Sequence, residues 1–169
     1  MTSDQGSGRE AASADWPSPA YAWYVVFVLM AAYTLSYIDR TIVDLLVGPI
    51  KADLGLTDTQ FSLLRGLAFA LFYTLLGIPL GQLADRRHRG RLIAAGIALW
   101  SIATALCGAA RNFSQLFAAR MAVGVGEAAL TPAAYSMIAD SFPPERRGRA
   151  FGAYASGTYV GIGLAIIIG

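Results

Sequence analysis

Long apolar segments alternate with short polar ones along this chain, following a polar start. Each segment is near the ~20 residues with which a helix crosses a ~30 Å hydrocarbon core. Backbone groups in lipid must be satisfied within the segment, and the ten-residue alternating pattern of a membrane barrel is absent. The pattern therefore predicts an all-α membrane protein with about five transmembrane helices, near residues 21–47, 59–83, 92–110, 114–138 and 150–169.

The first twenty residues are small and polar, and they lack the basic start and short apolar core of a signal peptide. We expect residues 1–20 to form a disordered tail, and residues 21–169 to form one helix bundle. Trp16 and Trp23 flank the start of the first apolar segment, where aromatic rings favour the headgroup layer.

The connections between the apolar segments differ sharply in basic charge. DRRHRGR contains four Arg and PPERRGR contains three, whereas GPIKADLGLTD and ARNF contain one basic residue each. The positive-inside rule places the Arg-rich connections, and with them the amino terminus, in the cytoplasm. This indicates a multi-pass protein of the cell inner (plasma) membrane.

Composition narrows the classes of function. Apolar residues make up 56% of the chain and charged residues only 14%, well outside the range of soluble domains. The Arg residues gather at connections and form no long basic face, so a nucleic-acid partner is not expected. Cys107 and His88 are the only residues of their types, which argues against a metal site, and we expect no cofactor and no enzyme activity.

Six ionisable residues fall within the predicted spans. Each costs about 2.5 to 3.5 kcal/mol to insert into lipid, so such residues normally face a bundle interior and pair. Three are acidic and three are basic, which allows complete neutral pairing. They are Asp39, Arg40, Asp44, Arg65, Arg120 and Glu127.

Counting helical rise from the outer ends of the spans estimates their depth. Asp39 comes out about 12 Å deep and Arg65 and Arg120 about 9 Å deep, which puts them in one layer. Glu127 lies about 10 Å deeper than Arg120 and, seven residues on, shares its helix face. Alternatively, Asp44, Arg65 and the other outer charges lie at the membrane surface with their stems in lipid.

Such a set can carry protons and anions. Opening a carboxylate–guanidinium pair to water, or rearranging it, can bind or release a proton. Arg120 would remain charged and can anchor a carboxylate or phosphate through two hydrogen bonds. Protons and a small-molecule substrate are thus the expected partners, alongside the bilayer.

Glycine spacing predicts close helix packing. Gly77 and Gly81 are four residues apart, as are Gly157 and Gly161, a spacing that lets neighbouring helices approach. The run GVGEAA lacks the strand–turn–helix context of a nucleotide-binding loop. In GQLADRRHRGRL, Asp85 follows a tightly packed helix end and precedes several Arg. These charges could bond to helix ends and neighbouring loops on the cytoplasmic side and so act as a latch. The simpler alternative is that the Arg residues only set the topology.

Two motifs resemble the Major Facilitator Superfamily. The connection between its second and third helices reads approximately GxLaDRxGRR, which this chain matches at Gly81, Asp85, Arg86 and Arg89, with His88 and Gly90 departing from it. The segment RMAVGVGEA is similar to the family's second motif. It supplies Arg120, Gly124, Gly126 and Glu127, of which the two glycines would pack helices.

The runs SYIDRTIVDLL and GEAALTPAAYSMIADSFPPERRGRAFG look like the Spinster-like branch of that family. This resemblance implies a proton-coupled secondary transporter for a small amphiphilic or anionic solute. Asp39 would be the protonatable group, Arg120 its partner or the headgroup anchor, Glu127 a second acidic site, and Arg40 a member of the same set. It also implies that this chain is an amino-terminal fragment of a six-helix bundle, with a carboxy-terminal bundle missing. The alternative is a truncated, non-transporting membrane module that assembles with or regulates a partner.

Overall fold

The computed structural model describes residues 16–86 and 88–169, with the backbone alone for 84–86. The described residues are almost entirely helical and contain no strand. The elements are α1 (Pro19–Leu45), α2 (Val47–Leu54), α3 (Asp58–Ser62), the π-helical turn η1 (Leu63–Ala68), α4 (Phe69–Arg86), α5 (Arg89–Ala109), α6 (Phe113–Ala128), α7 (Leu130–Ser141) and α8 (Pro144–Ile168). Most of the tail predicted for residues 1–20 lies outside the described residues.

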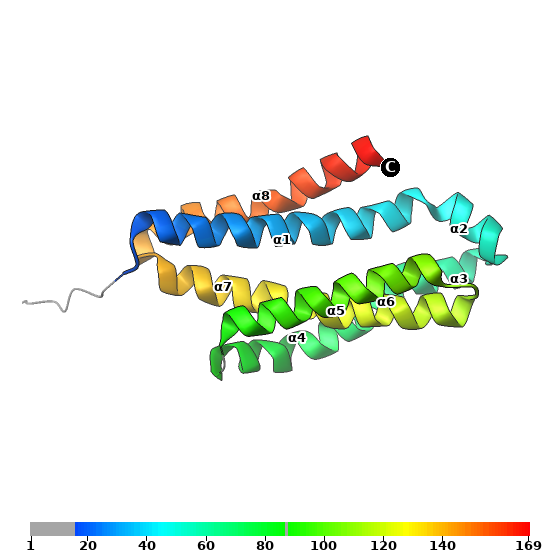
Figure 1. The fold of residues 1–169 in the computed structure, drawn as a ribbon, viewed down its shortest axis with the longest axis horizontal. Helices are drawn as coiled ribbons and strands as arrows, with labels where there is room; N and C mark the ends of the chain where they lie inside the picture. Colours follow the sequence, from blue (N-terminus) through cyan, green and yellow to red (C-terminus); the bar gives the residue numbers. More distant parts are fainter. Residues whose placement is uncertain (1–15, 87) are drawn as a thin grey trace, which may run out of the picture.

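The helices lie roughly parallel in an elongated bundle (Figure 1). α1 packs along α8, and α4, α5 and α6 pack on one another, with α7 in contact with both groups. The start of α1, the start of α5 and the start of α8 lie at one end, hereafter the inner end, at the left of Figure 1. α2, α3 and the connection from α5 to α6 lie at the opposite, outer end. All connections rich in Arg are therefore at the inner end, which the positive-inside rule assigns to the cytoplasm.

Among the described residues, four stretches are long and apolar enough to cross a membrane. They are Pro19–Leu45, Asp58–Leu83, Arg89–Ala109 and Pro144–Ile168. The remaining predicted span, 114–138, is not one continuous helix: it divides into α6 and α7 at Ala129.

Proline explains this break and a second one. Pro132 is the third residue of α7, so it cannot donate to the carbonyl of Ala128, the last residue of α6. Pro49 is likewise the third residue of α2, and Leu45, four residues before it, ends α1. The span predicted over 21–47 thus ends at Leu45, and α2 turns off from it.

The last helix, α8, begins before the apolar stretch from which we predicted it. We predicted a start at Ala150, with PPERRGR as a loop, yet α8 begins at Pro144 and includes all three Arg of that motif. Pro143 is the N-cap and Pro144 the first residue, where a missing N–H and a fixed φ suit a helix start. Hydropathy marked only the part of this helix that is apolar.

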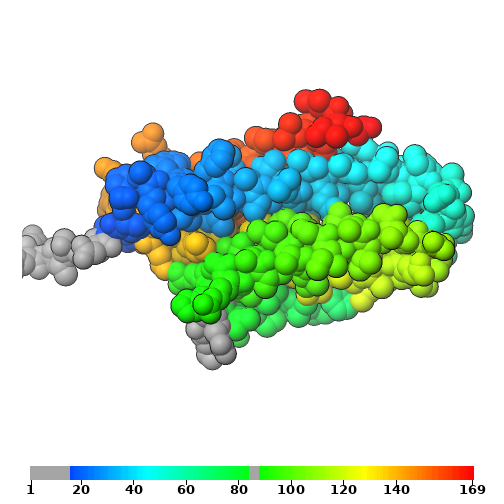
Figure 2. Space-filling model, viewed as in Figure 1, coloured from blue at the N-terminus to red at the C-terminus, as the bar shows by residue number. Residues whose placement is uncertain are grey.

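Apolar side chains lie both in the core of the bundle and on its outside. The main core lies between α1, α5, α7 and α8, and includes Val26, Trp100, Ile138 and Tyr154. Large apolar side chains also cover the outside, among them Phe27, Ile78, Ile102, Tyr159 and Ile167. Figure 2 shows one side of the outer surface of the bundle. Such an exterior is typical of a protein whose solvent is lipid.

Candidate functional site

The site consists of four charged side chains on two helices, Asp39 and Arg40 from α1 and Arg120 and Glu127 from α6. Ser36 and Arg40 are four residues apart and share a face of α1, while Arg120 and Glu127 are seven apart and share a face of α6. Arg120 and Glu127 are buried, at 4% and 1% exposure. The two faces meet inside the bundle, so the charges come together away from lipid.

Glu127 is held by three donors. Its Oε2 atom accepts from Arg40 Nη2 at 2.5 Å, Arg40 Nε at 2.8 Å and Ser36 Oγ at 2.6 Å. Its Oε1 atom is buried and has no hydrogen-bond partner among the described residues. Two nitrogens of the guanidinium thus bind the same carboxylate oxygen, and Oε1 takes no part in the ion pair.

Asp39 pairs with Arg120, the buried cation of the site. Its Oδ2 atom accepts from Arg120 Nη1 at 3.3 Å, longer than the contacts at Glu127. The Asp39 side chain is 13% exposed, compared with 1% for Glu127. The contact of Asp39 is therefore the looser of the two, while Arg40, at 26% exposure, is the most exposed of the four side chains.

Aromatic rings separate and cover the two cations. The Phe69 ring centroid lies 4.4 Å from Arg40 Cζ and 5.7 Å from Arg120 Cζ, so one ring contacts both guanidinium groups. Tyr37 and Tyr73 lie over Arg40 at 5.1 and 5.2 Å. Cation–π contacts of this kind favour a charged guanidinium in a poorly hydrated place.

Close backbone packing allows the two helices and their neighbours to bring these groups together. A Cβ atom on Gly124 would lie 2.7 Å from the Phe69 carbonyl oxygen, and one on Gly161 would lie 2.6 Å from that of Thr34. Both contacts are too short for any side chain, so α6 meets α4, and α8 meets α1, through glycine. Gly126 and Gly157 make comparable approaches.

The structure adds to and corrects the predicted glycine set. Gly96, which we did not predict, meets Gly126: its Cβ would lie 2.6 Å from that residue's carbonyl oxygen. A Cβ on Gly81 would be in ordinary contact with Pro132, at 3.5 Å. Around Gly77 there is nothing within 4 Å, so its predicted packing role has no counterpart among the described residues.

Arg65 pairs with Asp44 and not with Asp39, with which we predicted that it shares a layer. Its Nε lies 2.7 Å from Asp44 Oδ1, and both side chains are substantially exposed, at 64% and 38%. Rise along a helix estimates the depth of a residue but not the direction in which its side chain points, so depth alone did not tell which charges would meet. All six charges are nevertheless paired, as three acids with three bases.

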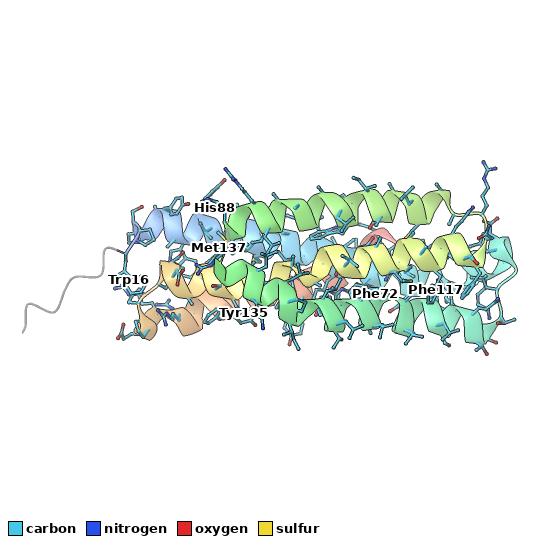
Figure 3. The ribbon with its side chains drawn as sticks, turned by 90° about the horizontal axis from the view of Figure 1, so that it is seen from below. Trp16, Phe72, His88, Phe117, Tyr135 and Met137 are labelled. Carbon is cyan, nitrogen blue, oxygen red and sulfur yellow. The ribbon has the colours of Figure 1, made fainter. Side chains whose placement is uncertain are left out.

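At the inner end, Arg89 forms an ion pair with Asp140, which links the start of α5 to the end of α7. Asp140 was not predicted, because nothing in its local sequence distinguishes it. The side chains of Asp85 and Arg86, the other predicted latch residues, lie outside what the structure describes. His88 and Met137 lie near this junction (Figure 3).

Sequence reasoning also missed Ser36, Phe69 and Tyr73. The four-residue step from Ser36 to Arg40 was a usable signal, because it places a hydroxyl beside a charge on one helix face. Phe69 and Tyr73 sit in an ordinary apolar run, FALFYTLL, where no local feature separates them from lipid-facing residues.

Comparison with known proteins gives consistent matches. Residues 29–169 match the Major Facilitator Superfamily. An MFS-type efflux pump of Mycolicibacterium smegmatis is 40% identical over 134 residues, which cover 79% of this chain and 31% of the pump. A probable L-galactonate transporter of Escherichia coli is 29% identical over 140 residues, 83% of this chain and 31% of that protein.

A solved structure is also similar. The crystal structure of a bacterial homolog of the human lysosomal transporter Spinster, inward-facing and unoccupied, superposes with a TM-score of 0.85 at 43% identity. The alignment covers 88% of this chain and 31% of that one. The chain thus spans about a third of the length of each of these three proteins.

Proposed function

This chain belongs to the Major Facilitator Superfamily, and from that premise we propose that it forms part of a proton-coupled secondary transporter. The transporter moves a small amphiphilic or anionic organic solute by alternating access, in the cell inner (plasma) membrane. Because the similar proteins are about three times as long, a second bundle completes the path that this one lines. The names of the matched proteins, an efflux pump, a galactonate transporter and a Spinster homolog, support transport of organic solutes in general.

One observation carries the proposal: adjacent residues of α1 hold opposite charges and pair with two different buried charges of α6. Asp39 bonds Arg120, and Arg40 bonds Glu127. Removing one partner of a buried pair leaves the other charge uncompensated, which is strongly unfavourable. A proton that neutralises Asp39 or Glu127 therefore forces the freed guanidinium to find another anion or to move.

Solute binding and proton binding are linked through this competition. An anionic group on a substrate can replace the carboxylate on Arg120 or Arg40, and in doing so stabilises the protonated acid. The aromatic rings of Tyr37, Phe69 and Tyr73 beside Arg40 offer apolar contact to the rest of such a solute. By linkage, a solute that binds better to the protonated protein raises its proton affinity by the same factor.

The latch residues act at a different step. Gly81, Asp85, Arg86 and Arg89 would hold the inner ends of the helices together in one state and release them in the other. The Arg89–Asp140 pair supports this role, because it ties two helices that do not follow each other in the chain. We expect Asp85→Asn to slow the conformational cycle while ligand binding stays near normal.

The test is flux in proteoliposomes that contain the complete protein of which this chain is a part. A panel of organic acids and single-chain amphiphiles is supplied with and without an imposed pH gradient, and internal pH is followed with a trapped dye. We expect at least one solute to move protons with it. Asp39→Asn, Glu127→Gln and Arg120→Ala should each abolish gradient-driven flux while leaving insertion intact.

Asp58→Asn is the matched control, because Asp58 also forms an ion pair, with Lys51, but is exposed at the outer end. It should leave flux unchanged. Unaltered transport in both Asp39→Asn and Arg120→Ala would remove the proposed site. Absence of flux for every solute, with correct insertion, would favour a non-transporting membrane module.

A further inference from the structure

A cavity of about 440 Å³ lies at the inner end of the bundle, where the start of α1 meets the end of α7 and the start of α8. Its lining includes Trp16, which precedes α1, Trp23 of α1, and Arg146 and Arg149 of α8. Figure 3 shows Trp16 at this end of the bundle. Trp23 and Asp39 are 16 residues apart on α1, about 24 Å at the helical rise, so this cavity is separate from the charged site described above.

Two arginines give the cavity a net positive charge. Arg146 and Arg149 are exposed, and neither side chain has an ion-pair or hydrogen-bond partner among the described residues. None of the described residues that line the cavity is acidic. The two arginines are three residues apart on α8, so they share a face of that helix. A phosphate group, with several acceptor oxygens, can therefore accept from both guanidinium groups.

Tryptophan places the cavity at the depth of lipid head groups. Trp16 and Trp23 are 38% and 44% exposed, and such rings favour the boundary between membrane and water. The Arg147 guanidinium lies over the Trp16 ring, with its Cζ atom 5.8 Å from the ring centroid. The positive-inside rule assigns this end to the cytoplasm, and anionic lipids gather in the leaflet on that side.

An apolar groove of about 470 Å³ adjoins the cavity. It follows the first three turns of α1, from Ala20 to Met30, and Ala153 of α8 also lines it. Trp23 lines both the cavity and the groove, so the two are adjacent. Phe27 in the groove is 64% exposed, which places the groove on the outer surface of the bundle. An acyl chain whose head group fills the cavity would lie in this groove.

We propose that the cavity and the groove together bind an anionic phospholipid of the cytoplasmic leaflet. The lipid phosphate accepts hydrogen bonds from Arg146 and Arg149, and one acyl chain packs along α1 beside Ala153. A zwitterionic lipid would bring its own ammonium group into a cationic cavity, which opposes its binding. The site does not depend on the proposed transport, and its test uses no flux.

Native mass spectrometry of the complete protein in a fixed detergent resolves protein with no, one or more bound lipids. Dioleoylphosphatidylglycerol is the anionic probe, and dioleoylphosphatidylcholine, which has the same chains, is the zwitterionic one. We expect the first phosphatidylglycerol to bind about tenfold more tightly than the first phosphatidylcholine, since each Arg near a head group contributes a factor of about five. Glycerol 1-phosphate, a phosphate head group without chains, should not displace the bound lipid.

Variants test the cavity and the groove separately. Arg149→Gln should weaken the first phosphatidylglycerol about fivefold and leave phosphatidylcholine unchanged. Arg91→Gln is the matched control, because Arg91 is also exposed at the inner end but does not line the cavity. Ala153→Leu should weaken phosphatidylglycerol about tenfold, because the larger side chain takes the place of two lipid methylene groups in the groove. Ala155→Leu changes an exposed residue of the same helix outside the groove and should have no effect.

Four outcomes would overturn the proposal. Equal affinities for the two lipids would show that the cavity does not select an anionic head group. Equal losses in Arg91→Gln and Arg149→Gln would mean that any basic charge at the inner end attracts lipid. Displacement by glycerol 1-phosphate, or full binding in Ala153→Leu, would mean that the groove holds no acyl chain. Binding of phosphatidylglycerol only after deletion of residues 2–15 would mean that acidic residues of the tail occupy the cavity instead.

Discussion

Arg40 of α1 and the buried Glu127 of α6 form an ion pair in which one carboxylate oxygen accepts from two guanidinium nitrogens, at 2.5 and 2.8 Å. They lie 87 residues apart in the chain. Next to Arg40, Asp39 points to a different cation, Arg120. Two neighbouring residues of one helix thus hold two separate charges of another, and each pair constrains the other through the backbone that they share.

This relationship predicts coupling between Arg40 and Glu127 in a double-mutant cycle. Arg40→Gln and Glu127→Gln should each destabilise the protein, because each leaves one charge buried without its partner. The double variant should lose less than the sum of the two, with an interaction free energy of about 1–3 kcal/mol. The measurement is thermal or denaturant unfolding in a fixed detergent.

The same cycle for the exposed pair of Lys51 and Asp58 is the control, and should give about 0–1 kcal/mol. Additive effects of Arg40→Gln and Glu127→Gln would mean that the buried pair does not form in the folded protein.

A second prediction concerns the contact of α8 with α1. Gly161→Ala should destabilise the protein by about 1–3 kcal/mol, because the new Cβ would lie 2.6 Å from the Thr34 carbonyl oxygen and force the helices apart. Gly163→Ala lies two residues away on the same helix, with nothing within 4 Å. It should be neutral or slightly stabilising, since alanine is the better helix former. Equal effects on the unfolding midpoint would contradict the packing of these two helices.

Topology gives a third prediction, testable by labelling in intact cells. In a Cys107→Ser background, a membrane-impermeant maleimide should label Arg111→Cys, which lies at the outer end between α5 and α6. It should not reach His88→Cys at the inner end until the cells are opened. The opposite pattern would invert the orientation that the Arg-rich connections assign.

The inner junction gives a fourth prediction. In the same background, Arg89→Cys and Asp140→Cys together should be joined rapidly by a short bifunctional reagent, because the native side chains form an ion pair. Arg89→Cys with Asp58→Cys places the thiols at opposite ends of the bundle and should not be joined. Gel mobility after limited proteolysis between α5 and α7 reads out the cross-link. Failure of the first pair would contradict the arrangement of these helices.

Much of the fold followed from the sequence, since hydropathy is a local property and lipid requires each span to satisfy its own backbone. The membrane-spanning all-α class and the resemblance to the Major Facilitator Superfamily were confirmed. The chain also predicted that its intramembrane charges could pair, because three acids and three bases balance. The breaks at Leu46 and Ala129 were not predicted, although Pro49 and Pro132 stand three residues beyond them.

Which charges pair was decided only by tertiary structure. Periodicity put Arg120 and Glu127 on one face of a helix, but nothing local tells that Arg40 meets Glu127 or that Arg65 turns aside to Asp44. These partners depend on the rotation of each helix about its axis. That rotation is set by close glycine contacts such as Gly124 with Phe69 and Gly161 with Thr34, between residues far apart in the chain. Local sequence determines which residues form a helix and how deep each one lies in the membrane. Packing between helices determines which side chain each residue contacts.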